Sequence, residues 1–245
     1  ADLAADQQAV VQRSHAQVGI HRGHHIEHGE HDAGDLLEHG DGSQDGDDHG
    51  DAGAELVEAV EKYKDKFETV KISEPLLGEV GEDASVVNSD KEAVAKAIAD
   101  TAVKEAGFDS MAAAAEEKTA FVFMGHGTSH TAKITYSQMQ SQINDLGFEN
   151  VFIGTVEGEP EDTSCQAVIE KVKEAGYTKV ILRPLMIVAG DHANNDMAGD
   201  EDGSWKTEFE KAGFEVTTVV EGLGGLTDIQ NLFVAHAQAA VDSLK

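Results

Sequence analysis

Residues 120–156 read AFVFMGHGTSHTAKITYSQMQSQINDLGFENVFIGTV, and this stretch decides the predicted fold. It begins with an apolar run over residues 120–124 and ends with a second one over residues 151–156. Between them, residues 131–146 carry an amphipathic helical pattern. Apolar runs joined by such a helix are typical of neighbouring parallel strands with a right-handed crossover. The stretch therefore predicts a β-α-β unit.

The same alternation continues towards the C-terminus. Further apolar runs occupy residues 180–188 and 214–220, and helical patterns occupy residues 162–175, 204–212 and 228–244. Strands that are apolar along their whole length are covered on both faces. The sequence thus predicts an α/β fold with a doubly wound parallel sheet, and residues 118–245 form its C-terminal lobe.

Residues 51–117 show a shorter version of this pattern. Leu56, Val60 and Tyr63 recur at helical spacing, and residues 67–72 alternate like a strand. A second helix is expected to begin at Asn88 or Ser89 and to run through residue 103. We interpret residues 51–117 as the remnant of a first α/β lobe.

Residues 1–50 differ in composition from the rest of the chain. Eight of the twelve histidines lie here among Asp and Gly, and large apolar residues are scarce. Such a segment is predicted to be disordered, because it buries too little apolar surface to offset the entropy of ordering. Three interpretations stay open: a metal-gathering tail, a divergent lobe, or the product of a reading-frame error or a truncated gene.

The net charge of −29, from 47 acidic and 18 basic residues, lowers the expectation of binding to nucleic acid or to an anionic membrane surface. No apolar run approaches the length of a membrane span, and no signal-peptide pattern is visible at the N-terminus. We therefore expect a cytoplasmic protein. The single cysteine, Cys165, falls in a helical pattern, where a small buried apolar role is expected.

Potential metal ligands follow three of the predicted strands. His126 follows the first run, Glu157 the second, and His192 the run that begins at residue 180. The carboxyl ends of parallel strands meet at one edge of a sheet, so these side chains are expected to converge. Two imidazoles and a carboxylate suit Co²⁺, Fe²⁺, Ni²⁺ or Zn²⁺. Taken alone, however, a histidine at a strand end is as often a core or capping residue.

The residues beside these ligands suggest room for a flat molecule. Gly127 and Gly158 permit tight turns and leave space above the strand ends. Residues 191–202 are strongly polar and are predicted to form a functional loop, in which Asp191 or Asp196 would orient a histidine. His130 is expected either to contact a substrate carboxylate or simply to face solvent at a helix start.

Two other residues allow two interpretations each, and a third allows one. Arg183 either binds a substrate carboxylate or forms a structural ion pair. Trp205 either closes the pocket or, as we prefer, packs its own helix. His236, in the last helical pattern, is expected to be structural.

Three motifs together resemble the class II chelatase family, specifically the anaerobic sirohydrochlorin cobaltochelatases. The motifs are FMGHGTSH at residues 123–130, GTVEG at residues 154–158, and RPLMIVAGDHANNDMAGDEDGSWK at residues 183–206. The resemblance covers about residues 55–245 and is strong over 118–245. In that family the matching positions form the metal site, which implies His126, Glu157 and His192. The family fold has two similar α/β lobes around a tetrapyrrole.

The resemblance implies insertion of Co²⁺ into a sirohydrochlorin-type tetrapyrrole, with His126 and His192 sharing metal binding and proton removal. Gly127, His130, Gly158, Asp191 and Asp196 are the expected substrate contacts. The family's opening strand, with its Ser-Phe-Gly-Thr-Ser-like turn, has no counterpart in residues 1–50, so the first lobe looks incomplete. Either a second subunit would then supply the missing wall of the pocket, which makes a homo-oligomer possible, or activity would be lost.

Two alternatives to cobalt insertion stay open. One keeps the fold and changes the metal to iron or nickel, because His and Glu ligands do not separate these ions. The other is a non-catalytic carrier of metal or tetrapyrrole, favoured by the His-rich N-terminus. A periplasmic-type binding protein is a weaker alternative, which the histidines at strand ends disfavour.

Overall fold

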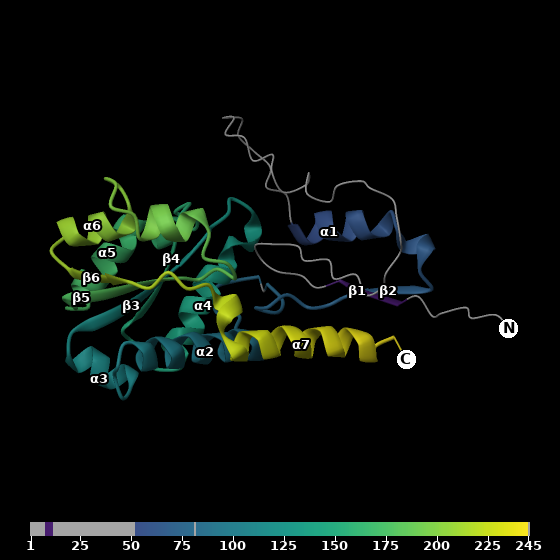
Figure 1. The fold of residues 1–245 in the computed structure, drawn as a ribbon, viewed down its shortest axis with the longest axis horizontal. Helices are drawn as coiled ribbons and strands as arrows, with labels where there is room; N and C mark the ends of the chain where they lie inside the picture. The colour runs from purple at the N-terminus through teal and green to yellow at the C-terminus, as the bar shows by residue number, and fades with distance from the viewer. Residues whose placement is uncertain (1–7, 12–51, 81, 245) are drawn as a thin grey trace.

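A computed structural model describes residues 8–11, 52–80 and 82–244 (Figure 1). Its main feature is a four-stranded, fully parallel sheet in the order β4-β3-β5-β6. The strands are β3 (Thr119–Gly125), β4 (Val151–Thr155), β5 (Lys179–Pro184) and β6 (Glu215–Thr218). In the centre of the sheet, Phe121 lies opposite both Val151 of β4 and Ile181 of β5. The predicted doubly wound α/β class is confirmed.

Helices alternate with these strands, as the sequence pattern predicts. The helices are α2 (Ser89–Glu105), α3 (Met111–Glu116), α4 (Ile134–Asp145), α5 (Cys165–Glu174), α6 (Trp205–Lys211) and α7 (Thr227–Asp242). Short 3-10 turns lead into three of them: η2 (Thr131–Lys133) into α4, η3 (Glu161–Thr163) into α5, and η5 (Leu223–Gly225) into α7. Among residues 52–80 and 82–244, no helix is both long and apolar enough to cross a bilayer.

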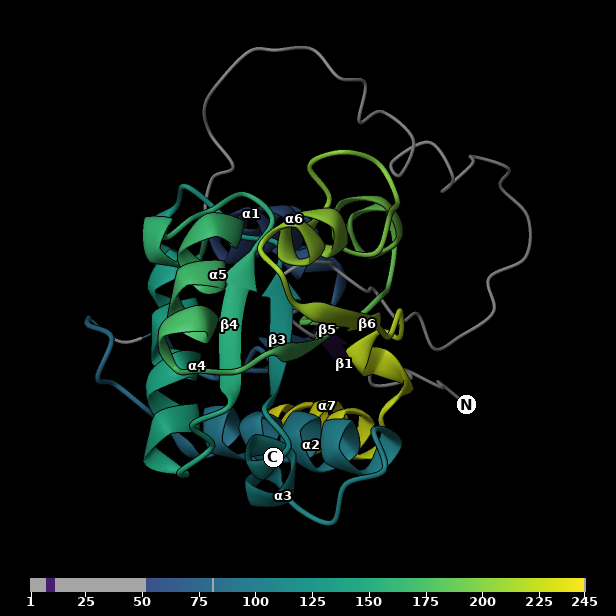
Figure 2. The ribbon, with the colours of Figure 1, turned by 90° about the vertical axis from the view of Figure 1, so that its left-hand side faces the viewer.

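The sheet separates two apolar cores because successive side chains of a strand point to opposite faces. Phe121 and Phe123 of β3 pack into one core together with residues of α2, α3, α4 and α7. Val122 and Met124 pack into the other core with residues of α5 and α6. Figure 2 shows the two helix layers on either side of the strands. Every residue of β3 is buried, as expected for the central strand of a covered sheet.

The predicted boundary at residue 117 separates segments that share a core. Val94, Ile98 and Ala102 of α2 are buried in the same apolar cluster as Phe121 of β3. The buried side chain of Asn150 also donates hydrogen bonds of 3.1 Å to the carbonyls of Met111 and Thr119. The boundary stays a prediction, and across it the packing is continuous.

A second, two-stranded parallel sheet joins β1 (Gln8–Val11) to β2 (Thr69–Ile72), beside α1 (Ala52–Glu61) and the turn η1 (Lys64–Lys66). The pattern of residues 67–72 predicts β2, but nothing in the polar residues 1–50 predicts β1. The expected disorder of the remainder of residues 1–50, and the His-rich tract within it, lie outside the described residues.

Two segments differ from their predicted form. Residues 185–188 are not part of β5, because Pro184 lacks an N–H donor and the neighbouring strand β3 ends at Gly125. Residues 192–197, predicted as a loop, form a π-helix, η4 (His192–Met197). Ala193 and Met197 of this helix are fully buried, so a polar sequence is anchored by two apolar side chains.

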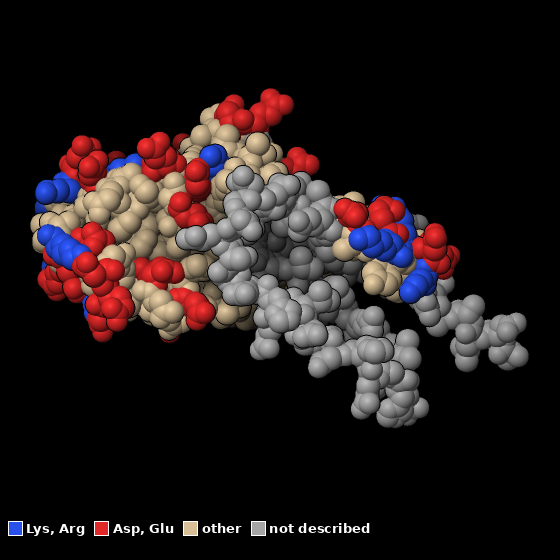
Figure 3. Space-filling model, turned by 90° about the horizontal axis from the view of Figure 1, so that it is seen from above, with Lys and Arg blue, Asp and Glu red and all other residues tan. Residues whose placement is uncertain are grey.

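Acidic side chains dominate the surface. Figure 3 shows Asp and Glu spread over the face that carries α5 and α6, with Lys and Arg between them. Lysines on this side are paired with carboxylates, as Lys211 of α6 is with both Asp202 and Glu208. On this face of the described residues, the acidic side chains are therefore spread out rather than gathered in one cluster.

Candidate functional site

The ends of the central strands bring His126 and His192 together. His126 directly follows β3, and His192 opens η4 after the loop that leaves β5. Their imidazole centroids are 4.7 Å apart, and the ring planes are nearly perpendicular at 81°. Both side chains are partly exposed, so a ligand can reach them.

The ring of His126 is fixed in one tautomer by the backbone. Its Nδ1 lies 3.0 Å from the carbonyl oxygen of Gly127. A carbonyl oxygen only accepts hydrogen bonds, so Nδ1 carries the proton. Nε2 is then unprotonated, and its lone pair is available for a metal ion.

The ring of His192 is fixed in the same tautomer by a carboxylate. Its Nδ1 lies 2.6 Å from Oδ2 of Asp196, four residues further along η4. This pairing leaves Nε2 of His192 free as well and fixes the orientation of its ring. Of the two predicted orienting residues, Asp196 contacts the histidine, whereas the side chain of Asp191 is exposed just before η4.

Glu157 lies beside His126 through the backbone. Its N–H donates to the carbonyl of His126 at 2.9 Å, which extends the pairing of β3 with β4 by two residues. The Glu157 side chain itself is exposed. In the part of the chain that the structure describes, no three His, Cys, Asp or Glu side chains are grouped closely enough to hold a metal ion. The ligand role of Glu157 stays a prediction.

Gly127 has the backbone geometry that the turn requires. Its φ of +94° lies in the left-handed region, and a Cβ at this position would come within 2.8 Å of Cβ of Glu157. Gly158 also has a positive φ, of +64°. Both glycines thus allow the loops after β3 and β4 to pass close to one another.

The loop that carries Glu157 is held by a compact polar network. The buried hydroxyl of Thr155 accepts a hydrogen bond of 3.1 Å from the N–H of Glu159 and lies 2.6 Å from the hydroxyl of Thr163. Nζ of Lys133, at the start of α4, lies 2.6 Å from Oε2 of Glu159. This ion pair connects the loop after β3 to the loop after β4.

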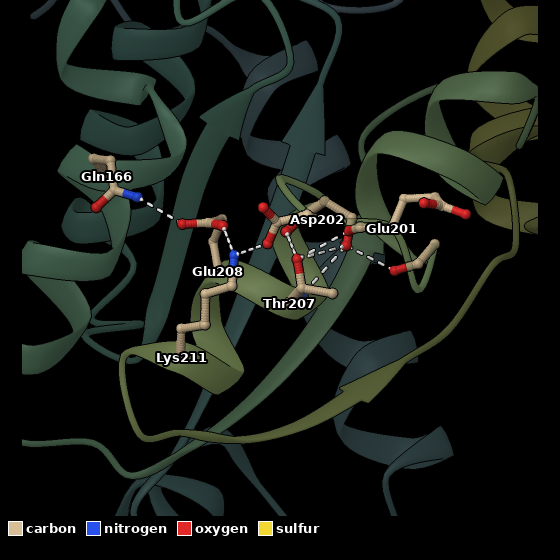
Figure 4. Close-up of polar contacts among 8 residues, drawn as sticks. Gln166, Glu201, Asp202, Thr207, Glu208 and Lys211 are labelled. Atoms are coloured by element: carbon tan, nitrogen blue, oxygen red, sulfur yellow. Dashed lines mark hydrogen bonds and ion pairs between the residues drawn. The ribbon is translucent and has the colours of Figure 1, made fainter.

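The segment that follows η4 is anchored on α6 (Figure 4). The hydroxyl of Ser204 donates to the carbonyl of Gly199 at 2.7 Å, and that of Thr207 donates to the carbonyl of Glu201 at 3.1 Å. Lys211 pairs with both Asp202 and Glu208. The acidic Asp202 of this stretch therefore helps to fix the segment after the π-helix against α6.

Four other residues from the sequence analysis have structural contacts. Nδ1 of His130 accepts a hydrogen bond from the N–H of Ala132, which caps η2. Arg183 is buried and lies 2.5 Å from Glu105 of α2, and Trp205, only 4 % exposed, packs over Gly154. His236 lies 3.1 Å from Asp90, which links α7 to α2. These contacts favour the structural interpretation of Arg183, Trp205 and His236.

Sequence reasoning missed Tyr136, which lies directly behind His126. Its ring packs against Gly125, and its hydroxyl accepts a hydrogen bond of 3.0 Å from the N–H of Gly127. Burial raises the pKa of Tyr136 above its ordinary value, and the backbone N–H groups of Gly127 and His126 offset part of that rise. No local pattern marks this residue, because it is one of several polar positions in the helical stretch 131–146.

Comparisons with known proteins point to one family. A family model described as cobalt chelatase (CbiK) matches residues 48–242. A sirohydrochlorin cobaltochelatase of Salmonella typhimurium is 42 % identical over 121 residues, which cover 49 % of this chain and 44 % of that protein. A sirohydrochlorin cobaltochelatase, CbiKC, of Nitratidesulfovibrio vulgaris is 33 % identical over 125 residues, which cover 51 % of this chain and 43 % of that protein.

The match to these curated relatives spans less than half of their own length. Among solved structures, SirB from Bacillus subtilis with Fe³⁺ aligns with a TM-score of 0.49 and 14 % identity. That alignment covers 77 % of this chain and 66 % of SirB.

Proposed function

This chain belongs to the cobalt chelatase (CbiK) family, and on that premise we propose that it inserts Co²⁺ into a sirohydrochlorin-type tetrapyrrole. The observation that carries the proposal is the pair of imidazoles at the sheet edge. His126 and His192 lie 4.7 Å apart, and the partner of each Nδ1 leaves the Nε2 atom free. Two such nitrogen donors suit a borderline divalent ion such as Co²⁺, which is a substrate here.

Insertion requires that the metal shed its water, that the macrocycle bend, and that two pyrrolic N–H protons leave. Neutral imidazoles hold the incoming ion. Once the ion moves to the ring nitrogens, the same imidazoles are free to accept the protons, because the pKa of a histidine ordinarily lies close to neutral. His126 and His192 thus share metal binding and proton removal in this proposal.

The hydrogen-bond partners of the two histidines suggest that His126 and His192 contribute unequally to proton removal. The carboxylate of Asp196 stabilises a protonated His192, whereas the carbonyl of Gly127 is a neutral partner for His126. We therefore assign the larger part of proton removal to His192. Glu157, on the neighbouring loop, would lower the net charge of the metal-bound site and pass a proton outward.

The remaining candidate residues are assigned to the substrate. Gly127, Gly158 and the exposed Asp191 and Asp196 border the space above the strand ends, where we place the macrocycle. His130 already caps η2 through Nδ1, so only its Nε2 side is available to an acetate or propionate of the substrate.

The test is the anaerobic absorption change when the purified chain meets sirohydrochlorin and Co²⁺. We expect turnover above the uncatalysed rate, lost when His126 and His192 are both replaced by alanine. His236→Asn is the matched control, because this histidine lies in α7 and contacts α2. Metal and tetrapyrrole binding without turnover in the unaltered chain would contradict the proposal and support the carrier alternative.

The metal is tested in the same assay by competition. We propose Co²⁺ as the substrate metal, whereas Fe²⁺, Ni²⁺ and Zn²⁺ remain the alternatives that this donor set also accepts. A higher specificity constant for Fe²⁺ or Ni²⁺ than for Co²⁺ would reassign the chain to another chelatase activity on the same fold.

We propose further that the protein works in the cytoplasm and that a second copy of the chain completes the substrate pocket as a homo-oligomer. Light scattering with and without sirohydrochlorin measures the assembly; a monomer that turns over at full rate would contradict it.

A further inference from the structure

Tyr136 occupies a position behind the end of β3 that only glycine at residue 125 permits. Tyr136 is the third residue of α4 and is partly buried, packed against the core on that side of the sheet. A Cβ built on Gly125 would lie 2.4 Å from Cε1 of the tyrosine ring, much closer than real Cβ contacts. The ring therefore lies directly against the backbone that precedes His126.

The hydroxyl of Tyr136 holds the backbone that follows His126. The N–H of Gly127 is buried and lies beyond the last residue of β3, so the sheet does not pair it. Tyr136 accepts its hydrogen bond at 3.0 Å. A buried N–H without a partner is costly, so this contact constrains the turn.

His126 is thus flanked by two glycines that both contact the same side chain. The ring of Tyr136 fixes Gly125, and its hydroxyl fixes Gly127. Because Nδ1 of His126 donates to the carbonyl of Gly127, the direction of the imidazole depends on the conformation of this glycine.

We propose that Tyr136 is a positioning residue for His126: by fixing the backbone of Gly125 and Gly127, it selects the Nδ1–H tautomer and directs Nε2 of His126 into the site. The proposal rests on the proposed function only in assigning the Nε2 atom to the metal. The tautomer itself is a property of the metal-free protein and is measured without any reaction.

The first test is Tyr136→Phe, which keeps the ring against Gly125 and removes the hydroxyl. Long-range ¹H–¹⁵N NMR of the metal-free, ¹⁵N-histidine-labelled chain reports the tautomer of each imidazole. We expect a single Nδ1–H form for His126 in the unaltered chain and a mixture of two tautomers in the variant. His192, held by Asp196, should be unchanged and serves as the internal reference.

The second readout is Co²⁺ itself, followed by its visible absorption on binding. Loss of an outer partner of a ligating histidine typically weakens metal binding or activity by about 10- to 100-fold, and we expect a loss of that size in Tyr136→Phe. Tyr177→Phe is the matched control, because Tyr177 packs against Phe152 in the other core.

The outcomes separate the two proposals. An unchanged His126 tautomer in Tyr136→Phe would overturn the positioning role, even if the variant is less stable to heat. A changed tautomer in a chain whose Co²⁺ insertion survives His126→Ala would keep the positioning role and overturn the assignment of His126 to the metal.

Discussion

At the scale of single residues, the partner of His192 is decisive. The sequence left Asp191 and Asp196 as equal candidates, and the 2.6 Å contact selects Asp196. We expect Asp196→Asn to lower the rate of Co²⁺ insertion by about 10- to 100-fold, since an amide stabilises a protonated imidazole less well. Steady-state rates of Co²⁺ insertion are compared for Asp196→Asn and Asp191→Asn. A loss of rate in Asp191→Asn as large as that in Asp196→Asn, or larger, would contradict the prediction.

Gly127 gives a second residue-scale prediction. Gly127→Ala adds a cost of about 1–2 kcal/mol for the left-handed backbone and a clash with Cβ of Glu157 at 2.8 Å. Gly107→Ala is a matched control, because Gly107 has a φ of +78° with no atom within 4 Å of the added Cβ. We expect urea unfolding to show a larger loss for Gly127→Ala, together with loss of Co²⁺ insertion. Equal losses of stability would mean that the loops after β3 and β4 separate easily.

Cys165 should be chemically inert in the folded chain. Burial raises the pKa of its thiol to about 12, and the charge of Glu208 adds to the rise. Only the thiolate reacts with iodoacetamide, so alkylation at pH 8 should be slow in buffer and fast in urea. Rapid modification of the folded chain would show that the start of α5 opens readily.

The same residues show what the sequence can predict at this scale. His126 and His192 were predicted because each follows an apolar run, and parallel strands must end at one edge. Tyr136 was not predicted, because its importance comes from contacts with Gly127 and Gly125, which precede it by nine and eleven positions. Such contacts depend on how α4 lies against β3, which no local pattern encodes.

At the scale of secondary-structure elements, an ion pair between a buried guanidinium and a partly exposed carboxylate joins β5 to α2. The side chain of Arg183 is 5 % exposed, whereas that of its partner Glu105 is 40 % exposed. Glu105→Gln leaves a cation in the interior, which typically costs about 3 kcal/mol or more. Arg183→Met leaves a carboxylate that water can reach and should cost less. Urea unfolding gives the free energy of unfolding of both variants. A greater loss of this free energy in Arg183→Met than in Glu105→Gln would contradict the prediction.

A matched control for that pair is Glu92→Gln. Its partner Lys96 lies one helical turn away on α2, and both side chains are about half exposed. An exposed pair of this kind contributes roughly 0.3–0.5 kcal/mol, so the control should barely change the free energy of unfolding.

The elements themselves followed from apolar periodicity, with two instructive exceptions. Met186, Ile187 and Val188 continue the apolar run of β5, but the strands on both sides have already ended, at Gly125 and Thr218. The carbonyls of Met186 and Ile187 instead accept hydrogen bonds from the N–H groups of Leu223 and Gly224, so this segment pairs with the turn η5 and not with a strand. The π-helix after it depends on buried Ala193 and Met197 and on a side-chain hydrogen bond from Asn194 to the carbonyl of Gly190 at 2.8 Å.

At the scale of the whole molecule, the net charge of −29 should act in opposite directions on the two proposed substrates, Co²⁺ and the tetrapyrrole. The acidic surface of Figure 3 attracts Co²⁺ and repels a tetrapyrrole that carries acetates and propionates. Between about 0.02 and 0.2 M KCl, screening should lower the specificity constant for Co²⁺ and raise that for the tetrapyrrole several-fold. Steady-state rates at each salt concentration give both constants. A parallel change in the two would show that association is governed by local charges in the site.

The described residues form a continuous body that composition alone did not suggest. Residues 51–117 were interpreted as the remnant of a separate lobe, yet α2 and α3 bury their apolar faces on the same sheet as α4 and α7. Long-range packing of this kind is not visible in a sequence, because any amphipathic helix is compatible with several partners. The doubly wound class was visible, because only a sheet covered on both faces uses strands as apolar as β3.

The strand order β4-β3-β5-β6 carries one more consequence. After β3 the chain turns to α4 on one face of the sheet, and after β5 it turns to η4 and α6 on the opposite face. The two connections thus leave neighbouring strands for opposite faces, at what is known as a topological switch point, where open α/β sheets generally bind ligands. His126, after β3, and His192, at the start of η4, lie on either side of this point. The strand order thus places both histidines where sheets of this kind bind ligands. The loops around that position can change in sequence without disturbing the strands beneath.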